Sequence, residues 1–401
     1  MIVECLIKIG DIGLVIKNNK MKIIILGGKG YLGWPMSMKL SSIGHKVTII
    51  DNGMKDKIAK SLNVKPLFPN SFTSKLKIFN KHKDNKINVL QYDCCNYKKI
   101  SKTFEVIKPD AIIHFAEQAS APYSMIDFMS SHLTLNNNIT STFNVLHAMK
   151  EYCPNSHLIK LGTMGEYGTP NIDIEEGWLT INHKNRKDKF IYPRAATSLY
   201  HTSKILDTDL IWFYVRNYNL RVTDLMQGPV YGFETKDMQK NDKLFTSLYF
   251  DSIFGTVINR FLVQASVGEP LTIYGKGEQT RGYLDINDTL QCIELALSNR
   301  VEKGELRILN QFTETLSVNQ IAEKIQKAGN LLKMNIKVKH IRNPRKEKES
   351  HYYRIKNTGL RKMGLKPHLL SQKNIIRMLE LIKSHIQKKD IKIYNSYVKW
   401  T

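Results

Sequence analysis

Cysteine is scarce in this chain, and metal-binding cysteine spacings are missing. The 401 residues include five cysteines, none of which forms a Cys-x-x-Cys pair. This excludes a disulfide framework and the usual type of structural zinc site, so we expect a reducing compartment and no bound metal. The five are Cys5, Cys94, Cys95, Cys153 and Cys292.

Long apolar runs are missing as well. No run approaches the roughly 18 residues that a membrane-spanning helix needs. Glu4 and Asp11 interrupt the first twenty residues, which contain neither serine nor arginine and therefore make a poor secretory signal and a poor transit peptide. We expect a soluble protein of a cytoplasm or a plastid stroma, without membrane insertion, in which residues 1–20 form an N-terminal extension.

Acidic residues are few compared with basic ones. There are 36 Asp and Glu against 60 Lys and Arg, which gives a net charge of +24. Lysine-rich stretches at 75–86, 184–189 and 342–348 could follow the phosphates of a nucleic acid, but lysine is abundant throughout the chain. We therefore expect no nucleic-acid partner and interpret the positive field as one that attracts small anionic substrates.

Residues 22–51 have the pattern strand (22–26), glycine-rich turn, helix, strand (46–50) and acid. Gly27, Gly30 and Gly33 allow a tight turn, close approach of the backbone to a diphosphate, and close packing of the helix on the sheet. Asp51 stands where an acid binds the adenosine ribose, which favours NAD over NADP because a 2′-phosphate would be repelled. The pattern predicts a dinucleotide-binding unit that takes NAD.

Expected strands and helices alternate through the following residues. We expect strands at 87–92, 111–115, 157–161 and 220–225, helices at 96–107, 131–152 and 195–218, a polar, lysine-rich insertion at 52–85 and a polar loop at 173–194. This order predicts an α/β fold with a Rossmann-type doubly wound parallel sheet and a smaller mixed α/β C-terminal substrate domain. We place the NAD-binding domain at 21–228 and the substrate-binding domain at 229–401.

Tyr200 and Lys204 lie four residues apart in an expected helix, so their side chains project from one face. An ammonium beside a phenol lowers the pKa of the tyrosine and makes it a usable base near neutral pH. Thr163, at the end of an expected strand, offers a hydroxyl to hold the substrate oxygen, and one of Asn136–Asn138 is expected to support the lysine or the active-site backbone. A solvated helix face is the alternative, but with the glycine-rich loop upstream we favour a catalytic pair.

Several longer motifs carry a resemblance to a known family. On them the chain resembles the extended short-chain dehydrogenase/reductase family, and within it the branch that forms sulfoquinovose, from residue 21 to the C-terminus. The motifs are Ser-Ala-Pro-Tyr-Ser-Met-Ile-Asp at 120–127, Thr-Met-Gly-Glu-Tyr-Gly-Thr-Pro-Asn at 163–171, Tyr-Gly-Lys-Gly at 274–277, Gln-Thr-Arg-Gly-Tyr-Leu-Asp at 279–285, Asn-Gln-Phe-Thr-Glu at 310–314 and Asn-Pro-Arg at 343–345.

The resemblance implies a reaction of UDP-glucose with sulfite that makes a sulfolipid head-group donor. It implies oxidation at sugar C4 by NAD with Tyr200 as base, loss of water across C5 and C6, addition of sulfite at C6, and return of the hydride to C4. A 4-keto group acidifies the C5 proton, and the resulting enone is an electrophile at C6. We also expect the reaction to fall in the hydrolase class.

One motif departs from related sugar 4,6-dehydratases. They carry an Asp-Glu pair directly after the threonine, whereas this chain has Met164 and Gly165. The resulting apolar wall could favour a sulfur nucleophile, and Glu166 and His201 become the candidate proton handlers. The alternative for His201 is a hydrogen-bonded histidine of the core.

The resemblance and the motifs together predict three sets of site residues. The resemblance also implies that the domain at 229–401 binds a UDP-sugar. Ala119 departs from the family pattern, because many relatives have arginine at this position. The basic segment at 54–57 departs from that pattern as well. The catalytic set is Thr163, Met164, Glu166, Tyr200, His201 and Lys204. The cofactor set is Gly27, Gly30, Tyr31, Leu32, Gly33, Asp51, Asn52, Asp93, Cys94, Ala116, Asn137, Tyr200, Lys204 and Val230. The substrate set is Thr163, Tyr200, Gln227, Asn259, Arg260, Thr272, Arg281 and Arg345.

Three interpretations stay open at this point. The first is the sulfite-using synthase, and the second is a UDP-hexose 4-epimerase or 4,6-dehydratase on the same scaffold. The third is a non-catalytic RNA-binding relative, against which the intact Tyr200 and Lys204 count. Enzymes of this family commonly pair through a helix bundle, so we expect a homodimer with residues 131–152 and 200–219 at its interface.

Overall fold

The structure is a computed structural model that describes residues 20–81, 83, 85–239, 241–344 and 351–386. Most of the expected N-terminal extension, at residues 1–19, and the predicted substrate residue Arg345 lie outside these ranges. Among the described helices, none combines the length and the apolarity that crossing a bilayer requires.

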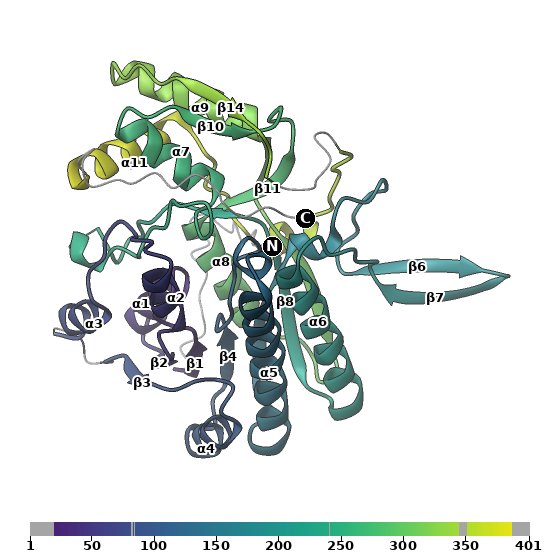
Figure 1. Cartoon of the computed structure of the whole chain (residues 1–401). Helices are drawn as coiled ribbons and strands as arrows, with labels where there is room; N and C mark the ends of the chain where they lie inside the picture. The colour runs from purple at the N-terminus through teal and green to yellow at the C-terminus, as the bar shows by residue number, and fades with distance from the viewer. Residues whose placement is uncertain (1–19, 82, 84, 240, 345–350, 387–401) are drawn as a thin grey trace, which may run out of the picture.

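A parallel sheet organises the molecule, and within the described residues it has seven strands in the order β12-β8-β5-β4-β1-β2-β3 (Figure 1). All of its pairings are parallel. The doubly wound Rossmann-type sheet expected from the sequence is therefore confirmed. The strands are β1 (Lys22–Leu26), β2 (Lys46–Ile50), β3 (Asn88–Leu90), β4 (Ala111–His114), β5 (His157–Thr163), β8 (Arg221–Gln227) and β12 (Leu306–Gln311).

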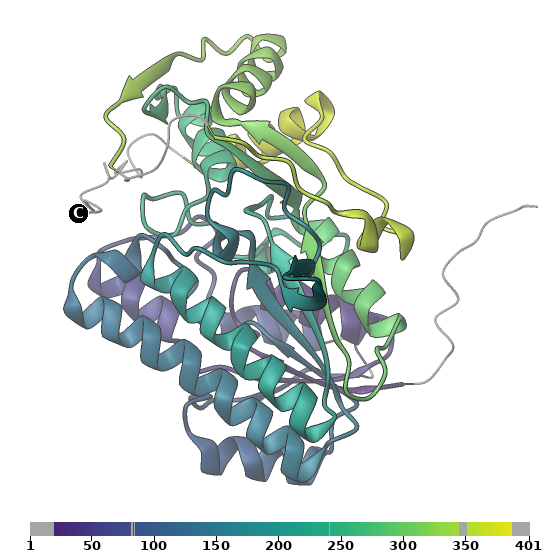
Figure 2. The same cartoon turned by 90° about the vertical axis from the view of Figure 1, so that its right-hand side faces the viewer.

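Helices cover both faces of this sheet because alternate strand residues point in opposite directions. In β1, Ile23 and Ile25 belong to one buried cluster, whereas Ile24 and Leu26 belong to another. The first cluster includes apolar residues of α1 (Gly33–Ser42) and α8 (Ile286–Ser298), and the second includes those of α4 (Tyr97–Ile107), α5 (Phe128–Tyr152) and α6 (Leu199–Tyr218). Figures 1 and 2 show α5 and α6 lying side by side along one face.

Smaller elements stack above the C-terminal edge of the sheet (Figure 1). β12 and α8 follow residue 228 in the chain, yet β12 is a strand of the parallel sheet and α8 packs on one of its faces. The sheet therefore draws on both sides of the boundary expected at 228, because the chain enters the upper lobe and returns. The upper elements are β9 (Val230–Tyr231), α7 (Val257–Ser266), β10 (Leu271–Tyr274), β11 (Thr280–Asp285), β13 (Glu314–Ser317), α9 (Val318–Leu331), β14 (Val338–Ile341), α10 (Thr358–Lys362) and α11 (Gln372–His385).

Two segments outside the expected strands and helices contain ordered elements. The segment at 173–194 contains an antiparallel hairpin of β6 (Trp178–His183) and β7 (Arg186–Ile191), which projects from the body in Figure 1. Its residues are mostly exposed on both faces, so the apolar alternation that marks a half-buried strand is weak. The segment at 52–85 contains α2 (Met54–Ser61) and α3 (Phe72–Asn80). The expectation of a loop at 173–194 was wrong.

Candidate active site

The turn between β1 and α1 depends on the absence of side chains at two of its glycines. Gly27 has a φ of +76°, and a Cβ there would lie 2.7 Å from the carbonyl carbon of Phe115. A Cβ on Gly33 would lie 2.2 Å from the carbonyl oxygen of Gly27. Both neighbours are backbone atoms, which cannot move aside. The loop therefore packs its backbone tightly and leaves the N-terminus of α1 open to an anion.

Asp51 is held in place at the end of β2. Its carboxylate accepts hydrogen bonds from the backbone N–H groups of Lys29, at 2.9 Å, and Gly53, at 2.7 Å. The Asn52 side chain donates to Asp93 at 2.9 Å, which ties the ends of β2 and β3 together. This arrangement presents a fixed acid beside the glycine-rich turn, as a ribose-binding site requires.

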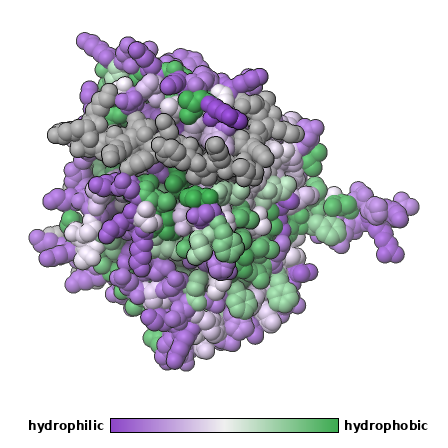
Figure 3. Space-filling view, in the orientation of Figure 1, coloured by the Kyte–Doolittle hydropathy of each residue, from purple (hydrophilic) through white to green (hydrophobic). Residues whose placement is uncertain are grey.

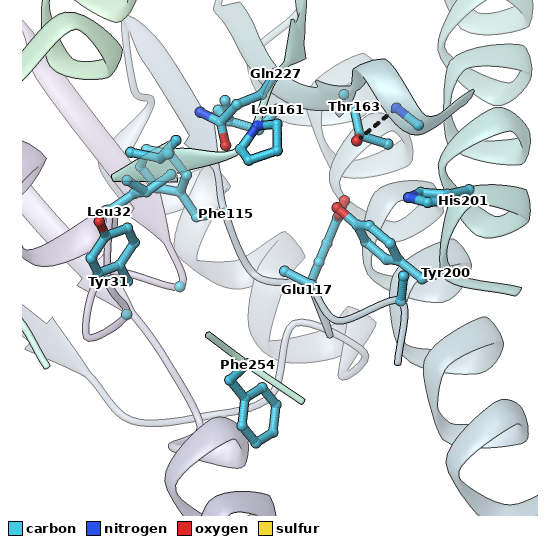
Figure 4. Close-up of a pocket in the computed structure, with 18 of the residues that line it drawn as sticks. Tyr31, Leu32, Phe115, Glu117, Leu161, Thr163, Tyr200, His201, Gln227 and Phe254 are labelled. Carbon is cyan, nitrogen blue, oxygen red and sulfur yellow. Dashed lines mark hydrogen bonds between the residues drawn. The ribbon is translucent and has the colours of Figure 1, made fainter. Parts of the chain in front are cut away.

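A cavity of about 880 Å³ runs from this turn to the C-terminal ends of β5 and β8. Figure 4 shows Tyr31 and Leu32 at one end and Thr163, Tyr200 and His201 at the other. The predicted site residues that line it are Gly27, Gly30, Tyr31, Leu32, Gly33, Asp51, Asn52, Asp93, Cys94, Ala116, Asn137, Thr163, Met164, Tyr200, His201, Gln227, Val230 and Arg281. Glu166, Lys204, Asn259, Arg260 and Thr272 are not among its lining residues.

Thr163 and Tyr200 lie close together at the end of the cavity away from the glycine-rich turn, where the sugar is expected. The Thr163 hydroxyl accepts a hydrogen bond from the N–H of Gly165 at 3.1 Å, and Tyr200 stands in the first turn of α6. Burial raises the pKa of Tyr200 above its ordinary value, while the charge of Lys204 and a hydrogen bond with Thr163 act in the opposite direction. We expected a lowered pKa for Tyr200, and this was wrong: Lys204 does lower the pKa, but burial raises it by more.

Lys204 lies behind the cavity wall. Its side chain is 1% exposed, and its ammonium donates hydrogen bonds to the carboxylate of Glu117 and to the carbonyl oxygen of Leu161. Glu117 itself lines the cavity, and in Figure 4 its side chain stands behind Tyr200 with its carboxylate beside the phenol hydroxyl. The predicted lysine therefore touches the site through Glu117, a residue for which we had predicted no catalytic role.

His201 occupies space that the absence of a side chain at Gly165 provides. A Cβ on Gly165 would lie 2.2 Å from Nε2 of His201. The imidazole faces the cavity next to Tyr200, with the two ring centroids 5.2 Å apart. The glutamate that related dehydratases carry at this position would collide with it, so His201 lies where that acid would begin. This supports the active-site interpretation over a core histidine.

Glu166 faces away from the cavity and is fully buried. Its carboxylate accepts from the N–H of Thr163 and from the hydroxyl of Thr208, both at 3.3 Å, and lies 3.6 Å from Arg194. Burial raises its pKa, and the charge of Asp224 raises it further. Direct proton transfer between Glu166 and a sugar does not fit this position; the carboxylate instead fixes the backbone that carries Thr163.

Asn138 is the asparagine of α5 that supports the site. Its amide accepts from the N–H of Gln118 at 2.9 Å and donates to the hydroxyl of Ser203 at 2.9 Å. Asn137 lines the cavity and donates to Asn138 at 3.0 Å. The buried amide thus joins the connection after β4 to the helix that carries Tyr200, which is one of the two roles expected.

The substrate residues predicted in the C-terminal half divide into two groups. Arg281 lines the cavity and lies 2.9 Å from Nε2 of His351. Away from the cavity lining, Asn259 accepts from the N–H of Gly232 at 3.0 Å, and Arg260 donates to the carbonyl oxygen of Thr272 at 3.0 Å. Arg260 therefore holds the upper lobe together, whereas Asn259 also donates to the hydroxyl of Tyr31 at 3.3 Å and ties this lobe to the glycine-rich turn.

Sequence reasoning missed a buried group of charged residues behind the site. Lys160 in β5 and Asp207 in α6 are both 1% exposed and form an ion pair of 2.8 Å, and Lys160 also pairs with Glu117. One signal was available: Lys160 and Asp224 interrupt otherwise apolar runs that predict buried strands. A charge at such a position requires a buried partner.

Comparison with known proteins agrees with this geometry. Residues 23–310 match the NAD dependent epimerase/dehydratase family. The chain is 44% identical over 384 residues to the chloroplastic UDP-sulfoquinovose synthase of Spinacia oleracea, covering 96% of this chain and 80% of that protein. It is 42% identical over 349 residues to the UDP-sulfoquinovose synthase of Sulfolobus acidocaldarius, covering 86% and 88%.

Solved structures share the fold at lower identity. A UDP-glucose 4-epimerase of Thermotoga maritima, solved with UDP-glucose, has a TM-score of 0.66 at 18% identity and covers 91% of this chain and 99% of that one. A UDP-glucuronic acid 4-epimerase of Bacillus cereus, solved with UDP-glucuronic acid and NAD, gives the same four values. The hydrolase class expected from the sequence was wrong, because the similar proteins are named synthases within a family of epimerases and dehydratases. The chain belongs to the NAD dependent epimerase/dehydratase family, in the group of the UDP-sulfoquinovose synthases.

Proposed function

We propose that this chain converts UDP-glucose and sulfite to UDP-sulfoquinovose with NAD as its cofactor. The observation that carries the proposal is the end of the cavity where Thr163, Tyr200 and His201 meet beside Met164 and Gly165. This arrangement combines the residues for oxidation at a sugar hydroxyl with a wall that lacks the usual dehydratase acids. The names and identity of the two synthase relatives support the same reaction.

The residues present fit NAD. Gly27 and Gly33 leave no room for side chains, so the backbone of the turn can approach a diphosphate, and Asp51 is fixed where a ribose would lie. When bound, NAD accepts a hydride from sugar C4 and later returns it. Met54 and Lys55 of the basic segment also line this end of the cavity, and Ala119 lines it where many family members have arginine.

Tyr200 and Thr163 carry out the chemistry at C4. Thr163 holds the O4 hydroxyl, and Tyr200 takes its proton as the carbon is oxidised. Because burial raises the pKa of Tyr200, the opposing charge of Lys204 is needed to keep the phenolate accessible. Later, Tyr200 gives the proton back to O4 as the carbon is reduced.

His201 is the cavity-facing group that handles protons at C5 and C6. Its imidazole lies beside Tyr200, and it can take the acidified C5 proton and assist the departure of the C6 hydroxyl. Met164 is buried in the same wall and offers only a thioether. Sulfite, as the hydrogen sulfite ion, then forms a C–S bond at C6 of the enone, and its proton is passed through His201 to C5. Arg281 at the cavity supplies a positive charge for the diphosphate of the substrate.

A homodimer fits the outer surface of α5 and α6. Figure 3 shows apolar side chains gathered over these helices, and a contiguous patch of exposed apolar residues commonly marks a protein interface. We propose that they form a helix bundle with a second copy, in a cytoplasm or a plastid stroma. The exposed apolar residues are Phe128, Met129, Phe143, Leu206, Phe213 and Tyr218.

The test is incubation of the purified protein with NAD and UDP-glucose, with and without sulfite, followed by mass spectrometry of the nucleotide sugars. We expect a sulfonated product that appears only with sulfite. Turnover to an epimer or a 4-keto-6-deoxy sugar without sulfite would instead establish the second interpretation. Absence of NAD binding together with salt-dependent RNA binding would establish the third.

A further inference from the structure

Four buried charged side chains form a closed group behind Tyr200. Lys204 and Lys160 both contact the carboxylate of Glu117, one on each oxygen. Asp207 lies 2.8 Å from the ammonium of Lys160 and 3.7 Å from that of Lys204. The side chains of the two lysines and Asp207 are 1% exposed, and that of Glu117 is 6% exposed. We call these four residues the buried quartet.

With both lysines protonated, the quartet holds two ammonium groups and two carboxylates and is neutral. Burial lowers the pKa of Lys160 to about 7, and the charge of Asp207 opposes that shift. Three separate parts of the chain supply it: the connection after β4 carries Glu117, β5 carries Lys160, and α6 carries Lys204 and Asp207. Buried charges of this kind are stable only when each has its partner, and removing one leaves another uncompensated. The balance therefore depends on every member.

Burial shifts three groups around the quartet toward their neutral forms. Burial raises the pKa of Glu166 and of Asp224, which favours their neutral forms, and it lowers the pKa of His114. Arg194 is balanced by Asp209, with which it pairs. The charge that Tyr200 experiences from behind is therefore set mainly by the quartet. The titratable groups that face the quartet or Tyr200 are His114, Glu166, Arg194, Tyr200 itself, His201 and Asp224.

We propose that Lys160 is a positioning residue, which holds Glu117 against Lys204 and supplies the second positive charge that keeps the surroundings of Tyr200 neutral. Within the described part of the chain, Lys160 does not line the cavity and forms its ion pairs with Glu117 and Asp207, not with Tyr200 or Thr163. It acts through Glu117 and Lys204. The inference rests on the proposed function of Tyr200 as the base at sugar C4.

The proposal predicts opposite effects for the two signs of charge. Lys160→Met leaves the group with one excess negative charge, which disfavours the phenolate, so the pKa of Tyr200 rises by about one unit. Asp207→Asn leaves one excess positive charge, so the same pKa falls. The double variant Lys160→Met/Asp207→Asn is neutral again and should return Tyr200 to the wild-type value.

The experiment follows reduction of bound NAD by UDP-glucose across a range of pH, without sulfite. We expect the rising limb of the rate profile to move to higher pH in Lys160→Met, to lower pH in Asp207→Asn, and back in the double variant. A second readout needs no sugar: the ultraviolet absorbance of the Tyr200 phenolate in the NAD-loaded protein, measured against Tyr200→Phe. If UDP-glucose proves not to be the substrate, this titration still tests the quartet.

Lys75→Met is the matched control. Lys75 is another buried lysine, 4% exposed, which lies in α3, and its ammonium donates to the carbonyl oxygen of Phe245 at 2.6 Å. We expect it to lower the thermal midpoint, as Lys160→Met does, without moving the limb. If Lys160→Met fails to fold, Asp207→Asn and the neutral double variant still decide. Unmoved limbs in both single variants, or movement in the same direction, would overturn the proposal.

Discussion

Replacing Gly165 with alanine should separate the two halves of the proposed reaction. The added Cβ would lie 2.2 Å from Nε2 of His201, whereas unstrained contacts of carbon with nitrogen are about 3.5 Å. The tip of a side chain can retreat, so the imidazole moves by about 1 Å while the fold persists. A misplacement of that size costs about 100-fold in a step that depends on the group.

The assay measures both halves in one protein. Reduction of bound NAD by UDP-glucose reports the step at C4, which uses Thr163 and Tyr200, and we expect it to change little. Formation of the sulfonated sugar with sulfite reports the steps at C5 and C6, and we expect it to fall about 100-fold in Gly165→Ala.

A double-mutant cycle controls for indirect effects. His201→Ala removes the group with which the new methyl collides, so adding Gly165→Ala to it should cost nothing more. If Gly165→Ala keeps the full sulfite-dependent rate, or if the double variant is much slower than His201→Ala alone, the assignment of His201 is refuted.

Three further outcomes follow from the site and the surface. Tyr200→Phe should slow reduction of NAD at least about 100-fold and abolish its rise with pH; in the wild type, burial raises the pKa of Tyr200, so the base form and the rate increase as the pH increases. Gly33→Ala should abolish NAD binding in calorimetry or destabilise the fold, because its Cβ would lie 2.2 Å from a backbone oxygen. Gly268→Ala has open space around it but a φ of +72°, so it should lower the stability and still bind NAD. Phe213→Asp should shift the protein from dimer to monomer in sedimentation, with the exposed Val106→Asp, on α4, as the unchanged control.

Strands of the parallel sheet and helices that cover it could be predicted, because the sequence patterns that indicate them are local. The strands at 22–26 and 46–50 have the bounds expected, since short apolar runs between glycine-rich turns leave few alternatives. The helix that carries Tyr200 was also found, although it begins at Leu199 and not at residue 195. Ser198 caps it by accepting from the N–H of His201, and this cap fixes where the helix starts.

The positions of the remaining site residues depend on contacts between distant parts of the chain. Nothing near Arg260 or Thr272 in the sequence shows that they bond to each other outside the cavity lining. The return of β12 to the sheet likewise follows from pairing with β8, which is more than 70 residues earlier. The hairpin at 178–191 lacked the apolar alternation that reveals a strand.

By itself, the sequence determined the nucleotide-binding unit, the Tyr200 and Lys204 spacing and the family to which these belong, because each is encoded within one helix or one turn. Only the tertiary structure decided how charge is arranged around them. It placed Lys204 behind Glu117, paired Lys160 with Asp207 and set His201 over Gly165. Burial and long-range pairing set these interactions, and both arise only when segments distant in the chain pack together.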